Sequence, residues 1–267
     1  MRYSEPAPAK LNLALHVRGR LADGRHQLET LFAFCTDGDW LEAEAAEELG
    51  LEIAGPFAQG LSADDNLVMQ AAERLRAAAG TTSGARLFLT KKLPVASGIG
   101  GGSADAAAAL RLLTRLWCID PACAAEIAPG LGSDVPACLL SMAARGEGAG
   151  DDLALVDDDS IAGRPVLLVN PRVELSTATV FAGWDGIDRG PLGDWRVGRN
   201  DLEVPARALA PQIGQLLDWL ISQPGADFVR MSGSGATCFA LFDGEQARDA
   251  AASTCPPEWW HLATFLR

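Results

Sequence analysis

The chain has 267 residues, of which 48% are hydrophobic and 21% are charged. This length gives room for one large domain or two smaller ones, and the apolar content is ample for a packed core. The formal net charge of −13 argues against nucleic acid or an anionic membrane as a partner, because either would need a basic surface. Neither a long apolar run nor a signal-like N-terminal segment is present, so we expect a cytoplasmic protein.

The six cysteines form no C-x-x-C pair and, with only three histidines, show no zinc-site spacing, so we expect reduced, buried thiols. Lysine is scarce, because the 22 basic residues include only Lys10, Lys91 and Lys92. A lysine inside an apolar segment or beside a glycine cluster is therefore a candidate for a specific role. Composition drift is the alternative explanation for Lys91 and Lys92.

The N-terminal part is predicted to begin with a meander of strands. Four short segments have the pattern typical of strands, over residues 11–18, 28–35, 40–45 and 51–53. Asp65-Asn66 then opens a helix that ends at Gly80, and a strand over 85–90 leads into a glycine cluster. A second helix is predicted over 104–116, with Ser103 as its N-cap.

The rest of the chain mixes helices and strands. Helices are predicted over 121–128, directly after the turn at 131–136, and near 201–209, 211–222 and 245–253. Strands are predicted over 153–156, 165–169, 227–231 and 237–242, and at the C-terminus. A soft domain boundary falls between 155 and 165. This order predicts an α+β fold.

The glycine cluster is the segment that says most about function. Residues 93–107 read Leu-Pro-Val-Ala-Ser-Gly-Ile-Gly-Gly-Gly-Ser-Ala-Asp-Ala-Ala. The glycines let several backbone N–H groups point at one anion, and the following helix adds its positive dipole end. No lysine follows as in a P-loop, and the third glycine and the acidic residue of a dinucleotide fingerprint are missing. A turn that only packs a helix on a sheet is the alternative.

Three segments resemble, in this order, the signature motifs of the GHMP kinases: Pro8 to Asn12, residues 94–104 and Met231 to Ala236. Residues 23–30, 65–67 and 132–136 are further similar to the 4-diphosphocytidyl-2-C-methyl-D-erythritol kinase family of that superfamily. The resemblance implies an N-terminal ATP-binding domain over 1–157, like domain 2 of ribosomal protein S5, and a ferredoxin-like C-terminal domain over 158–267. It implies ATP-dependent phosphorylation of the 2-hydroxyl of 4-diphosphocytidyl-2-C-methyl-D-erythritol, with Mg²⁺ accompanying the nucleotide, in the non-mevalonate route to isoprenoid precursors.

The resemblance also implies which residues bind ATP. The glycine loop would hold the phosphates, and residues before it would lie by the adenosine. The implied ATP-binding residues are Asn66, Lys92, Pro94, Val95, Ala96, Ser97, Gly98, Ile99, Gly100, Gly101, Gly102, Ser103 and Ala104. Asp105, next in the chain, is interpreted as a carboxylate that the helix dipole favours.

Lys10 and Asp134 match the catalytic pair of the family. A carboxylate at Asp134 can accept the proton of a hydroxyl group, and a nearby ammonium favours the ionised carboxylate and the developing alkoxide. The alternatives are an N-cap at Asp134 and a strand-end surface lysine at Lys10. Whether Asp134 removes the proton early or only orients the hydroxyl stays open.

For the acceptor, the resemblance implies binding by Asn12, Arg25, His26, Thr177, Phe181, Gly233 and Ser234. His26 would read the cytosine edge and Phe181 would stack on the ring; a structural histidine and a core phenylalanine are the alternatives. Relatives commonly have a tyrosine where this chain has Arg25. A guanidinium plane can also stack on a base.

Two other functions remain open. One is another GHMP kinase acting on homoserine or mevalonate, which His26 and Phe181 disfavour because neither acceptor carries a base. The other is a nucleotide-binding regulator without turnover, which the presence of both Lys10 and Asp134 disfavours. The expected partner is a small molecule, the expected state is a monomer or weak homodimer, and the sequence singles out no metal ligand.

Overall fold

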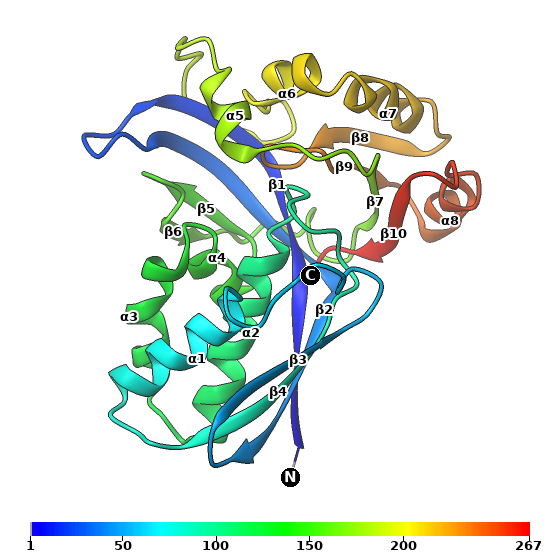
Figure 1. Cartoon of the computed structure of the whole chain (residues 1–267). Coiled ribbons are helices and arrows are strands. Elements are labelled where there is room, and N and C mark those ends of the chain that lie inside the picture. Colours follow the sequence, from blue (N-terminus) through cyan, green and yellow to red (C-terminus); the bar gives the residue numbers. More distant parts are fainter. Residues whose placement is uncertain (1) are drawn as a thin grey trace. The chain divides into compact units, whose positions relative to one another are not determined.

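A computed structural model describes residues 2–267 (Figure 1). The chain forms two compact units that are interleaved along the sequence. Unit 1 comprises the chain up to Ala9, Asp37–Val95 and Gly100–Ser141, and unit 2 comprises Lys10–Thr36, Ala96–Ile99 and Met142–Arg267. The predicted domain boundary at 157 divides the chain once, whereas each unit consists of three separate segments. As a boundary between the family domains, residue 157 stays a prediction.

Two long strands run through both units and pair with each other, β1 (Arg2–Arg20) and β2 (His26–Ala46). The predicted strands over 28–35 and 40–45 are therefore parts of one strand. The backbone stays extended through Gly38, where a Cβ atom would lie 2.0 Å from the carbonyl oxygen of Ala7. Only glycine lets the two strands approach this closely.

In unit 1, residues 40–46 of β2 pair antiparallel with β4 (Gly84–Thr90), and β4 pairs parallel with β3 (Leu49–Ala54). Four helices follow the pattern of the sequence: α1 (Leu67–Ala78), α2 (Gly101–Leu116), α3 (Pro121–Leu131) and α4 (Val135–Leu140). The side chain of Asn66 caps α1 by accepting a hydrogen bond from Val68 N. Helix α2 packs against the other three helices and is buried along most of its length.

Unit 2 contains a hairpin and a four-stranded sheet. Residues 30–32 of β2 pair with β5 (Ala144–Glu147), and β5 pairs with β6 (Asp152–Leu155). The antiparallel sheet has the order β10 (Trp260–Phe265), β7 (Pro165–Asn170), β9 (Cys238–Phe242), β8 (Ala226–Met231).

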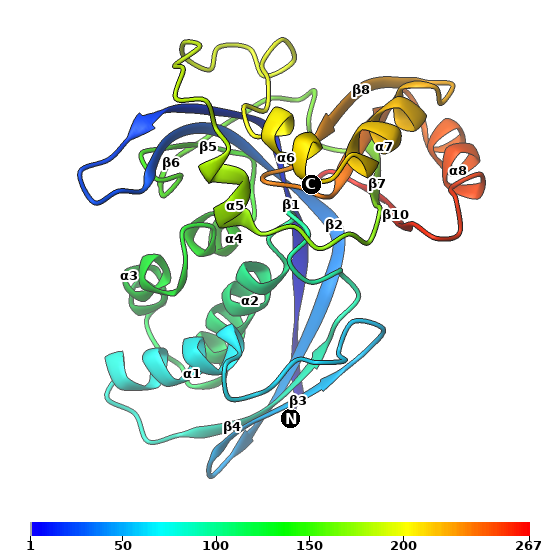
Figure 2. The same ribbon diagram turned by 45° about the horizontal axis from the view of Figure 1, so that its top comes forward.

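The helices of unit 2 are α5 (Thr177–Ala182), α6 (Glu203–Leu209), α7 (Gln212–Ile221) and α8 (Glu245–Ser253), as Figure 2 shows. Helix α7 packs on β8 and β9, and α8 packs on β7, β9 and β10. Their apolar faces share one core, in which Leu216, Leu220 and Phe242 are fully buried.

The α+β fold class is confirmed, and nearly all predicted elements are present. Two short elements, β5 and α5, are not predicted from the sequence. All six cysteines are free, and Cys35, Cys138 and Cys238 are buried as expected. Cys123 and Cys255 are half-buried and Cys118 is exposed, so the expectation of buried thiols is not met for these three residues. Among residues 2–267, no helix combines the length and apolar character needed to cross a membrane.

Candidate active site

The glycine loop leads into α2 one turn earlier than the sequence predicts. Gly100, not Ser103, is the N-cap, with φ of 65° in the left-handed region. That backbone conformation suits glycine, which explains why the predicted serine cap is wrong. The first intrahelical bond runs from Ala104 N to Gly100 O at 2.8 Å, so the N–H groups of Gly101, Gly102 and Ser103 precede the helical ladder. Helix N-termini of this kind favour anions.

A buried ion cluster lies at the base of this helix in unit 1. Lys91 Nζ donates to Asp105 Oδ2 at 2.7 Å and to Asp39 Oδ2. Asp39 Oδ1 in turn accepts from Leu93 N at 2.9 Å. Lys91 is only 3% exposed, whereas the side chain of Lys92 is exposed. Lys91 is therefore the buried lysine of this cluster. The expected position of Lys92 beside the adenosine of ATP stays a prediction.

The interpretation of Asp105 as a carboxylate that only the helix dipole favours is wrong, because it is buried and accepts a hydrogen bond from Lys91. Burial raises the pKa of Asp105 to about 7, and the charge of Lys91 opposes that shift. For Lys91, burial lowers the pKa, but the two carboxylates outweigh it and the net direction is upward. The cluster thus holds an ammonium group between two carboxyl groups in a dry environment.

The middle of the glycine loop, residues 96–99, belongs to unit 2 and is fastened there to the turn between β8 and β9. Thr237 N donates to Ser97 O at 3.1 Å, and Ser232 Oγ donates to Gly98 O at 3.0 Å. Gly98 has φ of 79°, and a Cβ atom there would lie 2.5 Å from Gly235 O. The loop and the turn therefore pack against each other through backbone atoms, with no side chain between them at Gly98.

Lys10 begins a buried chain of hydrogen bonds in unit 2. Its Nζ donates to Asn12 Oδ1 at 2.9 Å, Asn12 Nδ2 donates to Thr30 Oγ1 at 2.8 Å, and Thr30 Oγ1 donates to Ala14 O at 2.6 Å. Asn12 N donates to Ser232 Oγ at 3.1 Å. Lys10 is 3% exposed, so the alternative of a surface lysine is wrong. The hydrogen bond to Asn12 fixes where its ammonium group points.

The turn after β8 brings together further predicted residues of unit 2. Thr177 Oγ1 and Ser234 Oγ lie 2.9 Å apart and share a hydrogen bond. Gly233 lies close to Gly98 and Asn12, because a Cβ atom at Gly233 would be 2.9 Å from Gly98 O and 3.2 Å from Asn12 Oδ1. The structure thus places Asn12, Thr177, Gly233 and Ser234 around one turn.

An aromatic cluster lies elsewhere in unit 2. The ring centroids of His26 and Phe181 are 4.8 Å apart, and Trp184 meets the same histidine edge-on at 5.8 Å. Phe181 also packs against the hydrophobic core of the unit. The side chain of Arg25 takes no part in these ring contacts: its guanidinium pairs with Asp23 at 2.8 Å and with Asp151 at 3.3 Å.

Asp134 lies in unit 1, half-buried, at the residue before α4. Its backbone is in the right-handed helical region, and its side chain makes no capping hydrogen bond to α4. The alternative of an N-cap at Asp134 is therefore confirmed for its position, although the side chain makes no capping hydrogen bond. Its role as a proton acceptor stays a prediction.

Sequence reasoning did not single out three residues near these clusters: Lys91 as the buried lysine, Trp184 and Asn200. Asn200 Nδ2 donates to both Met231 O and Gly233 O, each at 2.8 Å. The spacing of Trp184, three residues after Phe181, was the available signal for the aromatic cluster. Within residues 2–267, no group of three His, Cys, Asp or Glu side chains is arranged to hold a metal ion.

Comparisons with known proteins agree with this geometry. Residues 66–142 match the GHMP kinases N terminal domain, and residues 188–260 match the GHMP kinases C terminal domain. The two matched segments are the two halves of a GHMP kinase.

The chain is 52% identical to the 4-diphosphocytidyl-2-C-methyl-D-erythritol kinase of Rhizorhabdus wittichii, over 100% of this chain and 96% of the relative. It is 49% identical to the enzyme of the same name from Sphingopyxis alaskensis, over 97% and 96%. The chain belongs to the 4-diphosphocytidyl-2-C-methyl-D-erythritol kinase family.

Solved structures support the same fold. A crystal structure of 4-(cytidine 5'-diphospho)-2C-methyl-D-erythritol kinase superposes with a TM-score of 0.85 at 32% identity, over 100% of this chain and 99% of the other. A homoserine kinase from Cytophaga hutchinsonii superposes with a TM-score of 0.72 at 17% identity, over 99% and 95%, and shares the fold alone. The expected GHMP two-domain α+β fold is confirmed.

Proposed function

We propose that this chain is an ATP-dependent kinase that phosphorylates the 2-hydroxyl of 4-diphosphocytidyl-2-C-methyl-D-erythritol. The products are the 2-phosphate and ADP, in the non-mevalonate route to isopentenyl diphosphate and dimethylallyl diphosphate. The observation that carries the choice of acceptor is the ring contact between His26 and Phe181 at 4.8 Å. Aromatic rings of this kind can contact a nucleobase, and homoserine and mevalonate contain no nucleobase. The names of the full-length relatives support the same acceptor.

For the donor, we assign the ATP phosphates to residues 94–104 and the start of α2. The bare N–H groups at Gly101, Gly102 and Ser103 match the negative charge that spreads over a transferring phosphoryl group. Asn66 and Lys92 are proposed to lie by the adenosine. Asn66 uses Oδ1 for the cap of α1, so its Nδ2 group is the part that would serve the nucleotide.

We propose that Mg²⁺ accompanies the nucleotide. A Mg²⁺ ion bound to phosphates keeps several waters and needs only one or two protein oxygens. The hydroxyl of Ser103, half-buried in the first turn of α2, fits that requirement. When bound, the ion would neutralise charge on the phosphates.

For the acceptor, we propose that Asp134 takes the proton of the 2-hydroxyl while that oxygen bonds to the γ-phosphorus. The bond from the γ-phosphorus to the bridging oxygen breaks, and ADP leaves with that electron pair. Lys10 stabilises the negative charge on the acceptor oxygen, and Asn12 holds the Lys10 ammonium group in place at 2.9 Å. Thr177, Gly233 and Ser234 are proposed to bind the diphosphate portion.

A coupled ADP-release assay tests this function, with the cytidine substrate, homoserine and mevalonate each offered separately. We expect turnover with the cytidine substrate alone. Turnover with only homoserine or mevalonate would assign the chain to another GHMP activity, and ATP binding without turnover would make it a regulator. The expected cytoplasmic location, the monomer or weak homodimer, and the absence of a nucleic-acid partner stay predictions.

A further inference from the structure

Trp184 shares His26 with Phe181. The indole meets the histidine ring edge-on, at an interplanar angle of 82° and a centroid distance of 5.8 Å, while Phe181 meets it at 33° and 4.8 Å. Trp184 N donates to Phe181 O at 3.2 Å, which continues the last turn of α5. The two aromatic residues are therefore presented three positions apart toward one partner ring.

Two ring nitrogens in this cluster are buried without a hydrogen-bond partner among residues 2–267, Nε2 of His26 and Nε1 of Trp184. Leaving a buried polar atom unsatisfied is unfavourable, and such atoms in a native structure call for an explanation. Burial, with help from the charge of Arg20, lowers the pKa of His26, so its ring is neutral near pH 7. A neutral imidazole has one donor and one acceptor nitrogen, and an indole only donates. Because protein atoms enclose both nitrogens, a ligand reaches them only when the rings part; a planar ligand with polar edge atoms would then satisfy both.

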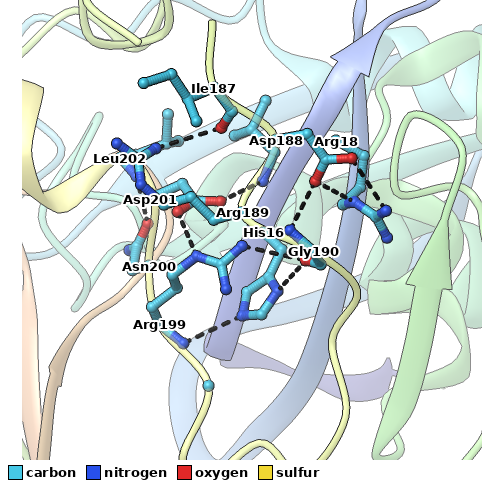
Figure 3. A network of polar contacts seen from close by, with 12 residues as sticks. His16, Arg18, Ile187, Asp188, Arg189, Gly190, Arg199, Asn200, Asp201 and Leu202 are labelled. Atoms are coloured by element: carbon cyan, nitrogen blue, oxygen red, sulfur yellow. Dashed lines mark hydrogen bonds and ion pairs between the residues drawn. The ribbon is translucent and has the colours of Figure 1, made fainter. Parts of the chain in front are cut away.

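The backbone around Trp184 is fixed on both sides. Before it, Gly183 packs so tightly that a Cβ atom would lie 2.8 Å from Pro205 Cβ. After it, the segment is held on β1, because Arg18 pairs with Asp188 at 2.7 Å and His16 Nδ1 lies 3.1 Å from Gly190 O (Figure 3). Anchors of this kind hold the backbone that carries the indole in place before a ligand arrives, which lowers the entropic cost of binding.

Arg25 is held by ion pairs and not by ring contacts with His26. Its side chain is 55% exposed and is engaged by the carboxylates of Asp23 and Asp151. Ion pairs with carboxylates engage the edges of a guanidinium and leave its faces free, so stacking by Arg25 stays a prediction. The aromatic surface available next to His26 and Phe181 is that of Trp184.

We propose that Trp184 is a specificity-determining residue of the acceptor site: its ring forms a wall for the cytosine, and its Nε1–H group donates to an acceptor atom on the edge of the base. This inference rests on the proposed function, and it names a residue outside the segments that carry the family resemblance. It separates two contributions, ring contact and hydrogen bonding, that two substitutions can remove in turn.

The test compares Trp184→Leu and Trp184→Phe with the matched control Trp219→Leu. Trp184 and Trp219 are both partly buried against the same core, but Trp219 contacts the ring of Trp259 instead of His26. We expect Trp184→Leu to raise the acceptor KM and the Kd for CDP about 10-fold or more, because stacking on an aromatic residue contributes strongly to base binding. Trp184→Phe keeps a ring and loses the donor, so we expect about a 5-fold rise. The KM for ATP should not change, and Trp219→Leu should leave both constants at wild-type values.

An acceptor KM and a CDP affinity that stay at wild-type values in both Trp184 variants would overturn the inference. Equal losses in the Trp219→Leu control would overturn it too, because the effect would then be general damage to the core. If Trp184→Leu does not fold, Trp184→Phe decides the question. Wild-type protein that binds CDP but does not turn over the cytidine substrate would instead overturn the proposed function, while the CDP titration would still decide the role of Trp184.

Discussion

Asn200 and Gly233 are joined by a hydrogen bond in which Asn200 Nδ2 donates to the carbonyl oxygen of Gly233 at 2.8 Å. The same amide group donates to Met231 O at 2.8 Å, and Oδ1 of Asn200 accepts from Leu202 N at 3.0 Å. Asn200 is buried, so neither carbonyl has water as a ready substitute. One side chain thus fixes the orientation of two peptide groups in the turn proposed to bind the acceptor diphosphate.

We therefore expect Asn200→Asp to raise the acceptor KM about 10-fold, with a smaller effect on the KM for ATP. A carboxylate cannot donate to the two carbonyl oxygens and repels both. Asn170→Asp is the matched control. Asn170 is also buried, but it donates to the hydroxyl of Thr237 at 2.9 Å, and a hydroxyl can reverse its bond and donate to a carboxylate. Steady-state kinetics give the acceptor KM of Asn200→Asp and of Asn170→Asp. Equal increases in the two variants would contradict a positioning role for Asn200.

Gly98 lies in the glycine loop and Gly102 in the first turn of α2, and the two differ in what a methyl group would meet. At Gly98 the backbone is left-handed and a Cβ atom would overlap Gly235 O and Ser232 O, whereas at Gly102 the nearest atom is Leu67 Cδ1 at 3.5 Å. We expect Gly98→Ala to lower the free energy of unfolding by about 2–5 kcal/mol. Gly102→Ala, inside a helix, should raise it by about 0.5–1 kcal/mol. Urea unfolding measures both, and a Gly98→Ala protein as stable as wild type would show that the loop relaxes freely.

The buried cluster around Lys91 predicts a pH dependence of stability. Burial raises the pKa of Asp105 to about 7 from an ordinary value of 3.8. Between pH 3.8 and about 7, Asp105 holds its proton in the folded protein but loses it in the unfolded chain. The contribution of Asp105 to stability is therefore present below about pH 4 and is lost as the pH rises toward 7. Asp105→Asn removes the titration and keeps the shape of the side chain.

The measurement is thermal unfolding of wild type and Asp105→Asn across that pH range. We expect the Tm difference between variant and wild type to shift in favour of the variant as the pH rises. Lys91 remains charged throughout, because its pKa is raised by the two carboxylates that outweigh its burial. Parallel Tm curves for the two proteins would mean that Asp105 does not titrate in this range.

The proposed proton acceptor predicts a selective loss of turnover. Asp134→Asn keeps the size of the side chain and removes its basicity, so we expect kcat to fall about 10²–10⁴-fold with little change in the KM for ATP. A kcat within about two-fold of wild type would limit Asp134 to orienting the hydroxyl, since general acid–base catalysis contributes far more than that.

Much of the fold is predictable because its signals are local. Asn66 precedes a segment in which apolar residues recur with the helical period of 3.6. Its preference for the N-cap and this periodicity therefore agree on where α1 begins. Ser103 satisfies the same cap preference, but α2 begins at Gly101 because Gly100 adopts a left-handed backbone angle. A backbone angle of that kind is set by the surrounding loop and cannot be derived from residue names.

The candidate site is less predictable, because its partners are far apart in sequence. Lys91 and Lys92 cannot be distinguished by residue type. Their positions directly after β4 determine that Lys91 is the one that turns inward to Asp39. Trp184 and Asn200 lie in the irregular stretch between α5 and α6. No motif marks either residue, and only the spacing of three positions from Phe181 points to Trp184. Motif residues such as Lys10 and Asn12 were found from sequence, while the residues that support them required three-dimensional contacts.

The most direct measurement of the central claim is ³¹P and ¹³C NMR of the product formed from ATP and 4-diphosphocytidyl-2-C-methyl-D-erythritol. Carbon 2 of the acceptor bears a methyl group and no hydrogen. We therefore predict one new phosphomonoester signal without proton coupling across the ester bond, and phosphorus coupling to carbon 2 and its methyl carbon. A new phosphorus signal split by ester protons, which would place the phosphate on a primary or secondary hydroxyl, or a lengthened phosphate chain on the cytidine side, would contradict the account.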